Sequence, residues 1–448
     1  MLDIRFIRDN PQTVQDKSAQ KGYSVDVSHV LRLDDQRREL QTKAEEIRRQ
    51  RNELADGLKK TKPTPQQIER GKALKTELAE VEDRLRVVDE EFFAALKKIP
   101  NMPLDDVPVG ASEEENVVAK TWGELPQFDF APKNHWEIAQ ARDWIDKERA
   151  AKVAGARFVY VKGELTLLHF ALLQFALSVL TNQETLKKII VDNNLQVSDK
   201  PFVPVLPPAV ARTEVYEATG RLNKEEQTYK LEDEDLWLNA SAEHTLAPMY
   251  LDEILPEADL PRRYVGYTTA FRREAGTYGK DMEGIFRLHQ FDKLEMESFS
   301  VGEDSLQEHL FMIAIQEYLM QQLKLPYQVV MKCTADIGGP NARGVDIDAW
   351  LPGQSRYRET HTADLITDYQ TRRMRTRVRR RKPLNELNAA TGHEVAGYTE
   401  FVELAHTNDA TAFSQRPLIA IIENYQQQDG TVVVPEVLQP FLGGRKVL

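Results

Sequence analysis

The chain has 448 residues, more than one hydrophobic core usually supports, so we expect at least two domains. Its formal net charge of -12 argues against nonspecific binding of polyanions by the whole surface. A net charge does not exclude local basic patches that bind a polyanion. The single cysteine, Cys333, excludes an internal disulfide and a cysteine-rich zinc cluster. Any metal would therefore be held mainly by oxygen or imidazole ligands.

The first residues and the most apolar segment favour a cytoplasmic protein without a membrane partner. MLDIRFIRDN carries charges where a secretory signal needs an apolar run. Leu165–Leu180 is interrupted by His169 and Gln174 and is shorter than the roughly 20 residues that span a bilayer. We interpret this segment as a buried helix.

Two heptad patterns predict a helical hairpin at about residues 30–98. Apolar residues recur at steps of three and four from Val30 to Leu58 and again from Leu74 to Ala95. The prolines of the intervening KKTKPTPQQ forbid one continuous helix. The two helices should therefore fold back on each other as an antiparallel coiled coil.

Basic residues gather toward the expected tip of this hairpin. They suit contact with a phosphate backbone, whereas the heptads alone would equally suit a dimerisation coiled coil. The residues are Lys59, Lys60, Lys62, Arg70, Lys72 and Lys75.

The remaining chain divides into a linker and a second domain. We assign residues 1–110 to the helical domain, the proline-rich and polar residues 111–131 to a linker, and residues 132–448 to the second domain. Short β-rich runs such as RRYVGYTT and YQVVMKC alternate there with helical stretches, without a glycine-rich phosphate loop. This pattern predicts a mixed α+β domain.

The segment 269–299 combines cationic and anionic side chains, as a site for a phosphate and an amine would require. On neighbouring strands such residues are also commonly a structural ion pair. They are Arg272, Arg273, Glu274, Arg287, Glu295 and Glu297.

Several segments resemble the seryl branch of the class II aminoacyl-tRNA synthetases. FRREAG and HQFDKLE resemble motif 2, PFVPVLPPAVARTEVYEATG resembles motif 1, and QRPLIAIIENYQ resembles motif 3. The resemblance extends from the hairpin to the C-terminal PEVLQPFLGGRKVL. It implies a tRNA-binding antiparallel helical arm, a catalytic domain with a central antiparallel β-sheet, and a homodimer formed through motif 1.

The resemblance implies a serine–tRNA ligase. Such an enzyme activates L-serine with ATP to seryl-adenylate and pyrophosphate, then transfers serine to the 3′ end of tRNA(Ser). Whether tRNA(Sec) is also a substrate stays open. The chemistry needs no side-chain nucleophile, because alignment and charge neutralisation do most of the work.

The resemblance also implies roles for residues around ATP, with Arg272, Glu274 and Arg416 as the catalytic set. Arg272 would hold the α-phosphate and Arg416 the γ-phosphate, while Glu274 and Phe291 would contact adenine. The whole expected ATP-binding set is Arg272, Arg273, Glu274, Leu288, Phe291, Glu359, Thr360, His361, Thr362 and Arg416.

A magnesium site is implied at RYRETHTADLITDYQTRR, where Glu359 and Thr362 supply a carboxylate and a hydroxyl. Hard oxygen ligands suit this ion. His361 replaces a small residue of the family there, and we interpret it as a local substitution in preference to a metal ligand.

Serine is expected to bind between SAEHTL and motif 3. The family's hydroxyl position falls on Ala410 in an ungapped match to Arg416 and on Thr411 after a one-residue shift; we prefer Thr411 because alanine has no hydroxyl. The expected serine-binding set is Ser241, Ala242, Glu243, Arg272, Glu295, Asn408 and Thr411.

Two other functions and one segment stay open. The chain is alternatively a catalytically silent RNA-binding descendant, or a ligase that loads an amino acid onto a carrier protein; retained charged residues oppose the first and the arm opposes the second. The basic insertion around 372–400 contains the run Arg375–Lys382, which suits either the acceptor stem of tRNA or a solvated loop.

Overall fold

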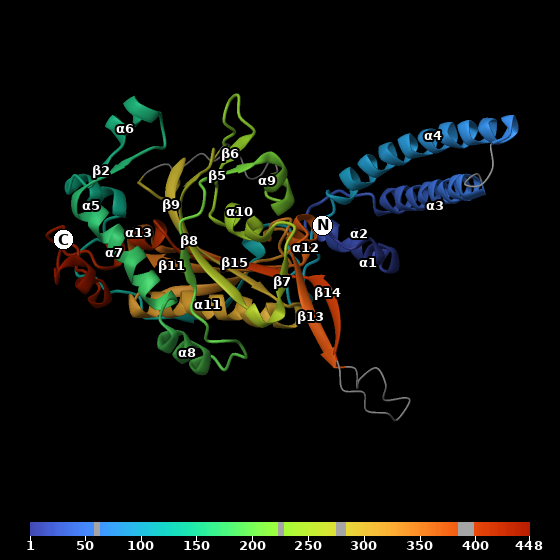
Figure 1. Ribbon diagram of the computed structural model, residues 1–448. Helices are drawn as coiled ribbons and strands as arrows, with labels where there is room; N and C mark the ends of the chain where they lie inside the picture. Colours follow the sequence, from blue (N-terminus) through green and yellow to red (C-terminus); the bar gives the residue numbers. More distant parts are fainter. Residues whose placement is uncertain (58–62, 223–227, 275–283, 384–397) are drawn as a thin grey trace. The chain divides into compact units, whose positions relative to one another are not determined.

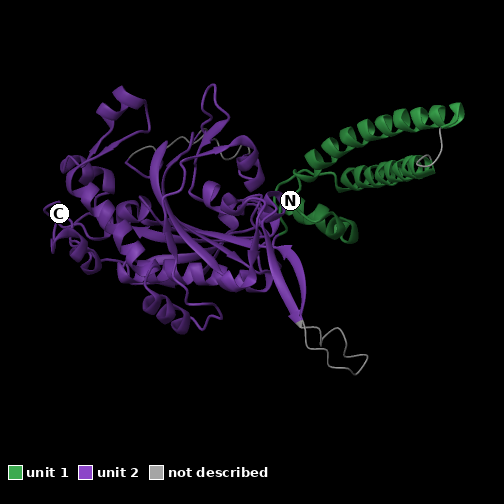
Figure 2. Ribbon diagram, in the orientation of Figure 1, with its two compact units in different colours: residues 1–102 green, residues 103–448 purple. Residues whose placement is uncertain are grey.

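The computed structural model describes residues 1–57, 63–222, 228–274, 284–383 and 398–448. These residues form two compact units, residues 1–102 and residues 103–448 (Figure 2). We describe each unit by itself.

Unit 1 is helical, and its two long helices lie side by side (Figure 1). They are α3 (Val27–Gly57) and α4 (Pro65–Leu96), preceded by α1 (Ile4–Asp9) and α2 (Pro11–Gln20). Thr64 caps α4 by accepting a hydrogen bond from the Gln67 amide, and Pro65 takes the first helical position, where its missing N–H costs nothing. The predicted hairpin is confirmed.

The seam between α3 and α4 is apolar at its centre. The residues that share it are Leu40, Ala44, Ile47, Leu74, Leu78 and Val81. Arg37 also lies on the seam, where its guanidinium covers the Phe92 ring at 4.9 Å and its Nε is 2.6 Å from Asp89 Oδ1. The long arginine stem can therefore occupy an otherwise apolar heptad position.

Unit 2 is built around an eight-stranded sheet in the order β1-β10-β11-β12-β15-β9-β8-β4. Neighbouring strands are antiparallel except β4, which is parallel to β8. The strands are β1 (Val117–Trp122), β4 (Val203–Val205), β8 (Arg262–Phe271), β9 (Gln290–Ser300), β10 (Tyr327–Met331), β11 (Arg343–Leu351), β12 (Arg356–Thr367) and β15 (His406–Ser414). The predicted α+β class with a central antiparallel sheet is confirmed.

Helices cover the apolar face of this sheet. Three of them, α7 (Gly163–Leu180), α11 (Ser305–Gln322) and α13 (Arg416–Asn424), pack into the main core with side chains of β9, β11, β12 and β15. The other described helices of unit 2 are α5 (His135–Ala141), α6 (Lys147–Ala154), α8 (Gln183–Asp192), α9 (Thr213–Thr219), α10 (Glu243–Leu246) and α12 (Tyr369–Met374).

Helix α7 is long and apolar enough to cross a membrane by length and composition alone. In the structure 56% of it is buried inside unit 2. Leu165, Leu168 and Leu180 are fully buried, in agreement with the buried helix expected there.

The segment expected to be a linker, 111–131, differs in the structure because it contains β1. This strand pairs with β10 at the edge of the large sheet, and the preceding residues are also bound to unit 2. Arg343 Nε lies 2.9 Å from Asp106 Oδ2, and the Thr334 amide donates to the Pro108 carbonyl at 2.8 Å. The side chains of β1 are mostly exposed, so no apolar alternation marks the strand in the sequence.

A second sheet contains β13 (Arg377–Pro383), β14 (Tyr398–Leu404) and β7 (Ile254–Pro256). Val378 of β13 is fully buried and packs with Val301 and Ala405. Arg380 forms ion pairs with three glutamates, Glu257, Glu303 and Glu403. Part of the expected basic insertion therefore forms a strand, while residues 384–397 lie outside the described residues.

The seam of the hairpin makes a testable contribution to stability. Leu74→Ala should lower the free energy of unfolding of unit 1 by about 2–4 kcal/mol, because it removes buried methyl groups and leaves a cavity. Ile68→Ala, at a side chain 47% exposed on the same helix, should cost less than about 1 kcal/mol. Denaturant unfolding of the full chain followed by circular dichroism measures both; equal effects would contradict the buried seam.

Candidate active site

The face of the large sheet opposite the helices carries charged side chains. Alternate residues of a strand point to opposite faces, so Leu294 and Met296 enter the core while Lys293, Glu295 and Glu297 point the other way. Glu295 pairs across strands with Thr411, and Glu297 with Asp409. The sequence thereby builds a polar floor from β9 and β15.

A cavity of about 350 Å³ opens on this face. Residues from the motif 2, magnesium and motif 3 segments line it together, although they are far apart in the sequence. The lining residues already named from the sequence are Arg272, Glu274, Arg287, Leu288, Phe291, Glu359, Thr360, Thr362, Thr411 and Arg416.

One end of the cavity is dominated by Arg416 at the start of α13. Its Nη1 lies 2.8 Å from Glu359 Oε1. Removal from bulk water would raise the pKa of Glu359, but Arg416 and Lys332 outweigh it and lower the pKa to about 2. The Glu359 carboxylate is therefore ionised at neutral pH.

Arg272 lines the cavity and is held by neighbouring groups. Its backbone amide donates to the His289 carbonyl at 2.9 Å, its Nε donates to the Ala240 carbonyl at 3.2 Å, and its guanidinium lies 5.2 Å from the Phe291 ring centroid. The Glu274 carboxylate accepts a hydrogen bond from Arg287 Nη1 at 2.9 Å. Both charged groups are thus oriented before any ligand binds.

Arg273, between these two residues, does not line the cavity. Its side chain is exposed, and its guanidinium lies 5.4 Å from the Tyr229 ring centroid.

The buried acidic side chains Glu243 and Glu295 lie behind the other end of the cavity, and each is paired with a basic side chain. Glu243 Oε1 accepts hydrogen bonds from Arg221 Nε at 2.9 Å and from Gln370 Nε2 at 2.8 Å. Lys293 Nζ lies 2.7 Å from Glu295 Oε2 and donates to Ser241 Oγ at 3.2 Å.

Four of the residues expected to bind serine lie near one another at this end of the cavity. Ser241, Glu243 and Glu295 lie directly behind Arg221 and Lys293, which line the cavity. Ala242 is fully buried beside them. Burial raises the pKa of Glu295, and the neighbouring Lys293 opposes that rise.

Three residues of the sequence analysis face the other side of the sheet. Asn408 donates from Nδ2 to the Ser305 carbonyl at 3.1 Å, at the start of α11. Ala410 is part of the apolar core, so Thr411 is the residue of this pair that lines the cavity. The His361 ring packs 5.5 Å from the Phe413 ring, and burial lowers its pKa to about 3.

The sequence analysis did not identify the basic side chains that pair with the buried acidic residues. Lys293 precedes Glu295 at strand spacing, so the alternation of β9 could have placed it on the same face. Arg221, which also lies 3.5 Å from Asp409 Oδ1, follows α9 in a loop without a local signal. Lys332, which lines the cavity 3.6 Å from Asp346 Oδ2, was missed for the same reason.

The donor set at Glu359 and Thr362 fits magnesium that arrives with a phosphate ligand. Among the described residues, no group of three or more His, Cys, Asp or Glu side chains could hold a metal alone. Mg²⁺ usually takes one or two carboxylates and completes its shell with phosphate oxygens and water. A carboxylate and a hydroxyl lining one cavity satisfy that requirement.

Known proteins are similar to this chain over its whole length. A model described as the seryl-tRNA synthetase N-terminal domain matches residues 1–103, and one described as the tRNA synthetase class II core domain (G, H, P, S and T) matches residues 228–405. A serine–tRNA ligase of Syntrophotalea carbinolica is 37% identical over 449 residues, covering 99% of both chains. This chain belongs to the seryl-tRNA synthetase family.

Solved seryl-tRNA synthetase structures share its fold. The enzyme from Pyrococcus horikoshii, complexed with ATP, has a TM-score of 0.83 and 33% identity, covering 100% of this chain and 99% of that one. The cytoplasmic serine–tRNA ligase of Naegleria fowleri, in complex with AMP, has a TM-score of 0.80 and 27% identity, with coverages of 100% and 98%. The likeness thus includes both units of this synthetase.

The floor of the synthetase cavity also contains a carboxyl group without a cation of its own. Glu297 is fully buried, and neither of its side-chain oxygens has a hydrogen-bond partner among the described residues. Burial, together with the nearby Asp409 and Glu243, raises its pKa well above the usual value. Glu297 is therefore expected to hold a proton at a pH where an exposed glutamate has lost it.

This raised pKa predicts a pH-dependent stability difference. Between the unfolded and folded pKa values of Glu297 the folded protein binds more protons, so its stability falls as pH rises through that interval. Glu297→Gln removes this loss, so the stability of the variant relative to the wild type should increase as the pH rises above about 4.3, the pKa of an unperturbed glutamate.

Urea unfolding at a series of pH values measures the difference. Glu114→Gln, at an exposed site, serves as the control and should leave the pH profile unchanged. A constant difference between Glu297→Gln and the wild type at every pH would contradict the protonated carboxyl.

Proposed function

We propose that this chain is a serine–tRNA ligase that converts L-serine and ATP to seryl-adenylate and pyrophosphate and then esterifies the 3′ end of tRNA(Ser). The observation that carries the proposal is the charge separation in one cavity. Arg272 and Arg416 line the cavity and would meet an anionic ligand, while Glu243 and Glu295, which lie behind Arg221 and Lys293 at the other end, would meet an ammonium group. The names and full-length similarity of the relatives support the same reaction.

Activation joins a serine carboxylate oxygen to the α-phosphorus of ATP and breaks the bond to pyrophosphate. Arg272 would neutralise charge on the α-phosphate, and Arg416 would meet the γ-phosphate. Glu274, Leu288 and Phe291 would hold the adenine. Prior orientation of these side chains by their protein partners lowers the cost of alignment.

Glu359 and Thr362 would hold magnesium bound to the phosphates, where the ion would supply further neutralisation of charge. Thr360 also lines this end of the cavity, and its hydroxyl donates to the Ile347 carbonyl at 2.9 Å. Thr360 would therefore keep β12 in place beside the ligand.

Ser241, Glu243, Glu295 and Thr411 would bind the ammonium and hydroxyl groups of serine. Buried acceptors that are left unpaired by alanine would reject that amino acid strongly. Asn408 and His361 would support β15 and β12 from the core side of the sheet.

Residues 1–110 would form the tRNA-binding arm and residues 132–448 the catalytic part. Arg70, Lys72 and Lys75 are exposed on α4, where they could contact a phosphate backbone; Arg70 Nη2 donates to Gln50 Oε1 at 3.0 Å. Lys59, Lys60 and Lys62 lie outside the described residues.

We further propose a homodimer working in the cytoplasm. Strand β4, from the motif 1 segment, ends the large sheet, and Leu206 beside it is 84% exposed. A sheet edge next to exposed apolar side chains suits pairing with a second chain.

Pyrophosphate exchange tests the adenylate chemistry. With magnesium, purified protein should incorporate labelled pyrophosphate into ATP when serine is present, and alanine should be about 10⁴-fold less effective. Threonine serves as a second comparison. Absence of exchange with every amino acid, from folded protein, would favour the silent RNA-binding descendant.

Thr411 offers a sharper test of serine recognition. Thr411→Val keeps the shape of the side chain and removes its hydroxyl, so KM for serine should rise about tenfold, the cost of one hydrogen bond. Thr376→Val, which removes a buried hydroxyl bound to the Tyr250 carbonyl at 2.9 Å away from the cavity, is the matched control. Equal KM values for serine in both variants would contradict the role of Thr411.

A further inference from the structure

Ile285, in the motif 2 segment, is fixed by hydrogen bonds to both its backbone amide and its backbone carbonyl. Its amide donates to His135 Nε2 at 3.4 Å, and its carbonyl accepts from Gln415 Nε2 at 2.7 Å. Ile285 itself is buried. Phe286 and Leu288, which follow Ile285 in the chain, line the cavity. The position of the Ile285 backbone therefore determines where these two side chains enter the cavity.

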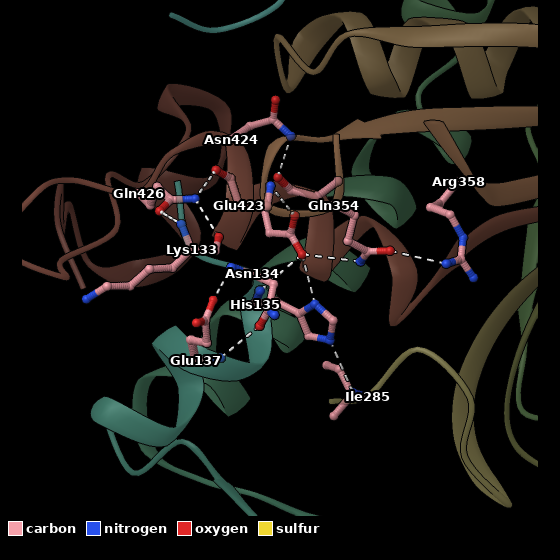
Figure 3. Close-up of polar contacts among 12 residues, drawn as sticks. Lys133, Asn134, His135, Glu137, Ile285, Gln354, Arg358, Glu423, Asn424 and Gln426 are labelled. Atoms are coloured by element: carbon pink, nitrogen blue, oxygen red, sulfur yellow. Dashed lines mark hydrogen bonds and ion pairs between the residues drawn. The ribbon is translucent and has the colours of Figure 1, made fainter. Parts of the chain in front are cut away.

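The His135 ring is in turn fixed by Glu423 (Figure 3). Glu423 Oε1 lies 2.9 Å from His135 Nδ1 and accepts the His135 amide at 3.0 Å, while Oε2 accepts the Gly353 amide at 3.0 Å. Because a carboxylate only accepts hydrogen bonds, the proton of a neutral His135 ring belongs on Nδ1. Its Nε2 is then left as an acceptor for Ile285.

Both ends of α13 therefore hold the same residue. Gln415 directly precedes this helix and binds the Ile285 carbonyl, whereas Glu423 near its last turn acts on the Ile285 amide through His135. The same nine-residue helix begins with Arg416. A rigid element thus connects the position of Ile285 to the position of the arginine in the cavity.

The backbone at Gly284 lies unusually close to His135. A β-carbon at residue 284 would be 2.0 Å from His135 Nε2, and φ at this glycine is +71°, which side chains rarely adopt. The chain can approach the ring this closely only without a side chain. The contact between His135 and this segment is therefore built into the local sequence.

Phe286 links the position of Ile285 to the arginine side chains at the cavity. Its ring contacts two guanidinium groups, those of Arg358 at 3.7 Å and Arg416 at 4.7 Å from the ring centroid. Arg358 Nη1 donates to Gln354 Oε1 at 3.1 Å, and Gln354 Nε2 lies 3.5 Å from Glu423 Oε1. Contacts thus lead from Glu423 to Phe286 by two routes.

We propose that His135 and Glu423 are positioning residues, which fix Ile285 and Phe286 and thereby hold Arg416 in the geometry that ATP requires. The effect on ATP rests on the proposed function, because it assumes that Arg416 binds the nucleotide. The proposed fixing of Ile285 by His135 and Glu423 does not depend on any enzymatic activity. The two parts can therefore be tested separately.

His135→Phe tests both parts because it keeps a ring and removes both nitrogens. Hydrogen–deuterium exchange at the Ile285 amide should become at least about tenfold faster, since the amide loses its acceptor. In pyrophosphate exchange, KM for ATP should rise about tenfold while KM for serine stays within about twofold. His135→Gln, which retains an acceptor and a donor, should restore part of both effects.

A control and an active-site count separate positioning from a general loss of structure. His309→Phe makes the same chemical change at a buried histidine of α11 and should leave both KM values and Ile285 exchange unchanged. Titration of active sites by the adenylate burst corrects kcat for unfolded protein, which leaves KM for ATP unaffected.

The outcomes distinguish the two proposals. Unchanged Ile285 exchange in folded His135→Phe protein would overturn the hold on Ile285. Faster exchange with unchanged KM for ATP in an active enzyme would overturn the link to Arg416. A wild type without serine-dependent exchange would overturn the proposed function, while faster Ile285 exchange in the variant would still support the hold.

Discussion

Burial of opposed charges on one face of an antiparallel sheet is the constraint on which this site depends. Glu243, Glu295 and Asp409 are almost completely withdrawn from water, which would be costly for isolated carboxylates. Arg221 and Lys293 offset that cost by ion pairs with them. Loss of one partner would leave an uncompensated buried charge, so these groups stabilise the floor only as a set.

The opposite face supplies the rigidity that this arrangement needs. Leu294, Met296 and Ala410 alternate with the charged residues and pack into the core under the helices. A shift of one residue in the pairing of β9 with β15 would exchange the two faces. Apolar packing therefore fixes the register that keeps Glu295 opposite Thr411 on the polar face of the sheet.

The sequence predicted local patterns well and contacts between distant residues poorly. Heptads predicted α3 and α4, and motif 2 brought attention to Arg272 and Glu295, because these signals lie within short segments. It could not predict β1, which has exposed side chains, or Arg221, which reaches the acids from a loop. The direction of Asn408 and the contact of His135 with Ile285, 150 residues away, depend on tertiary packing alone.

The central claim is that one chain joins serine to tRNA through this cavity. The most direct measurement is the formation of acid-precipitable labelled serine on a tRNA(Ser) transcript, with purified protein, ATP and magnesium. The account predicts charging of the 3′ end by serine, abolished by Arg416→Ala in a variant that remains folded. Wild-type protein that forms the adenylate but leaves tRNA uncharged, or a fully active Arg416→Ala variant, would contradict it.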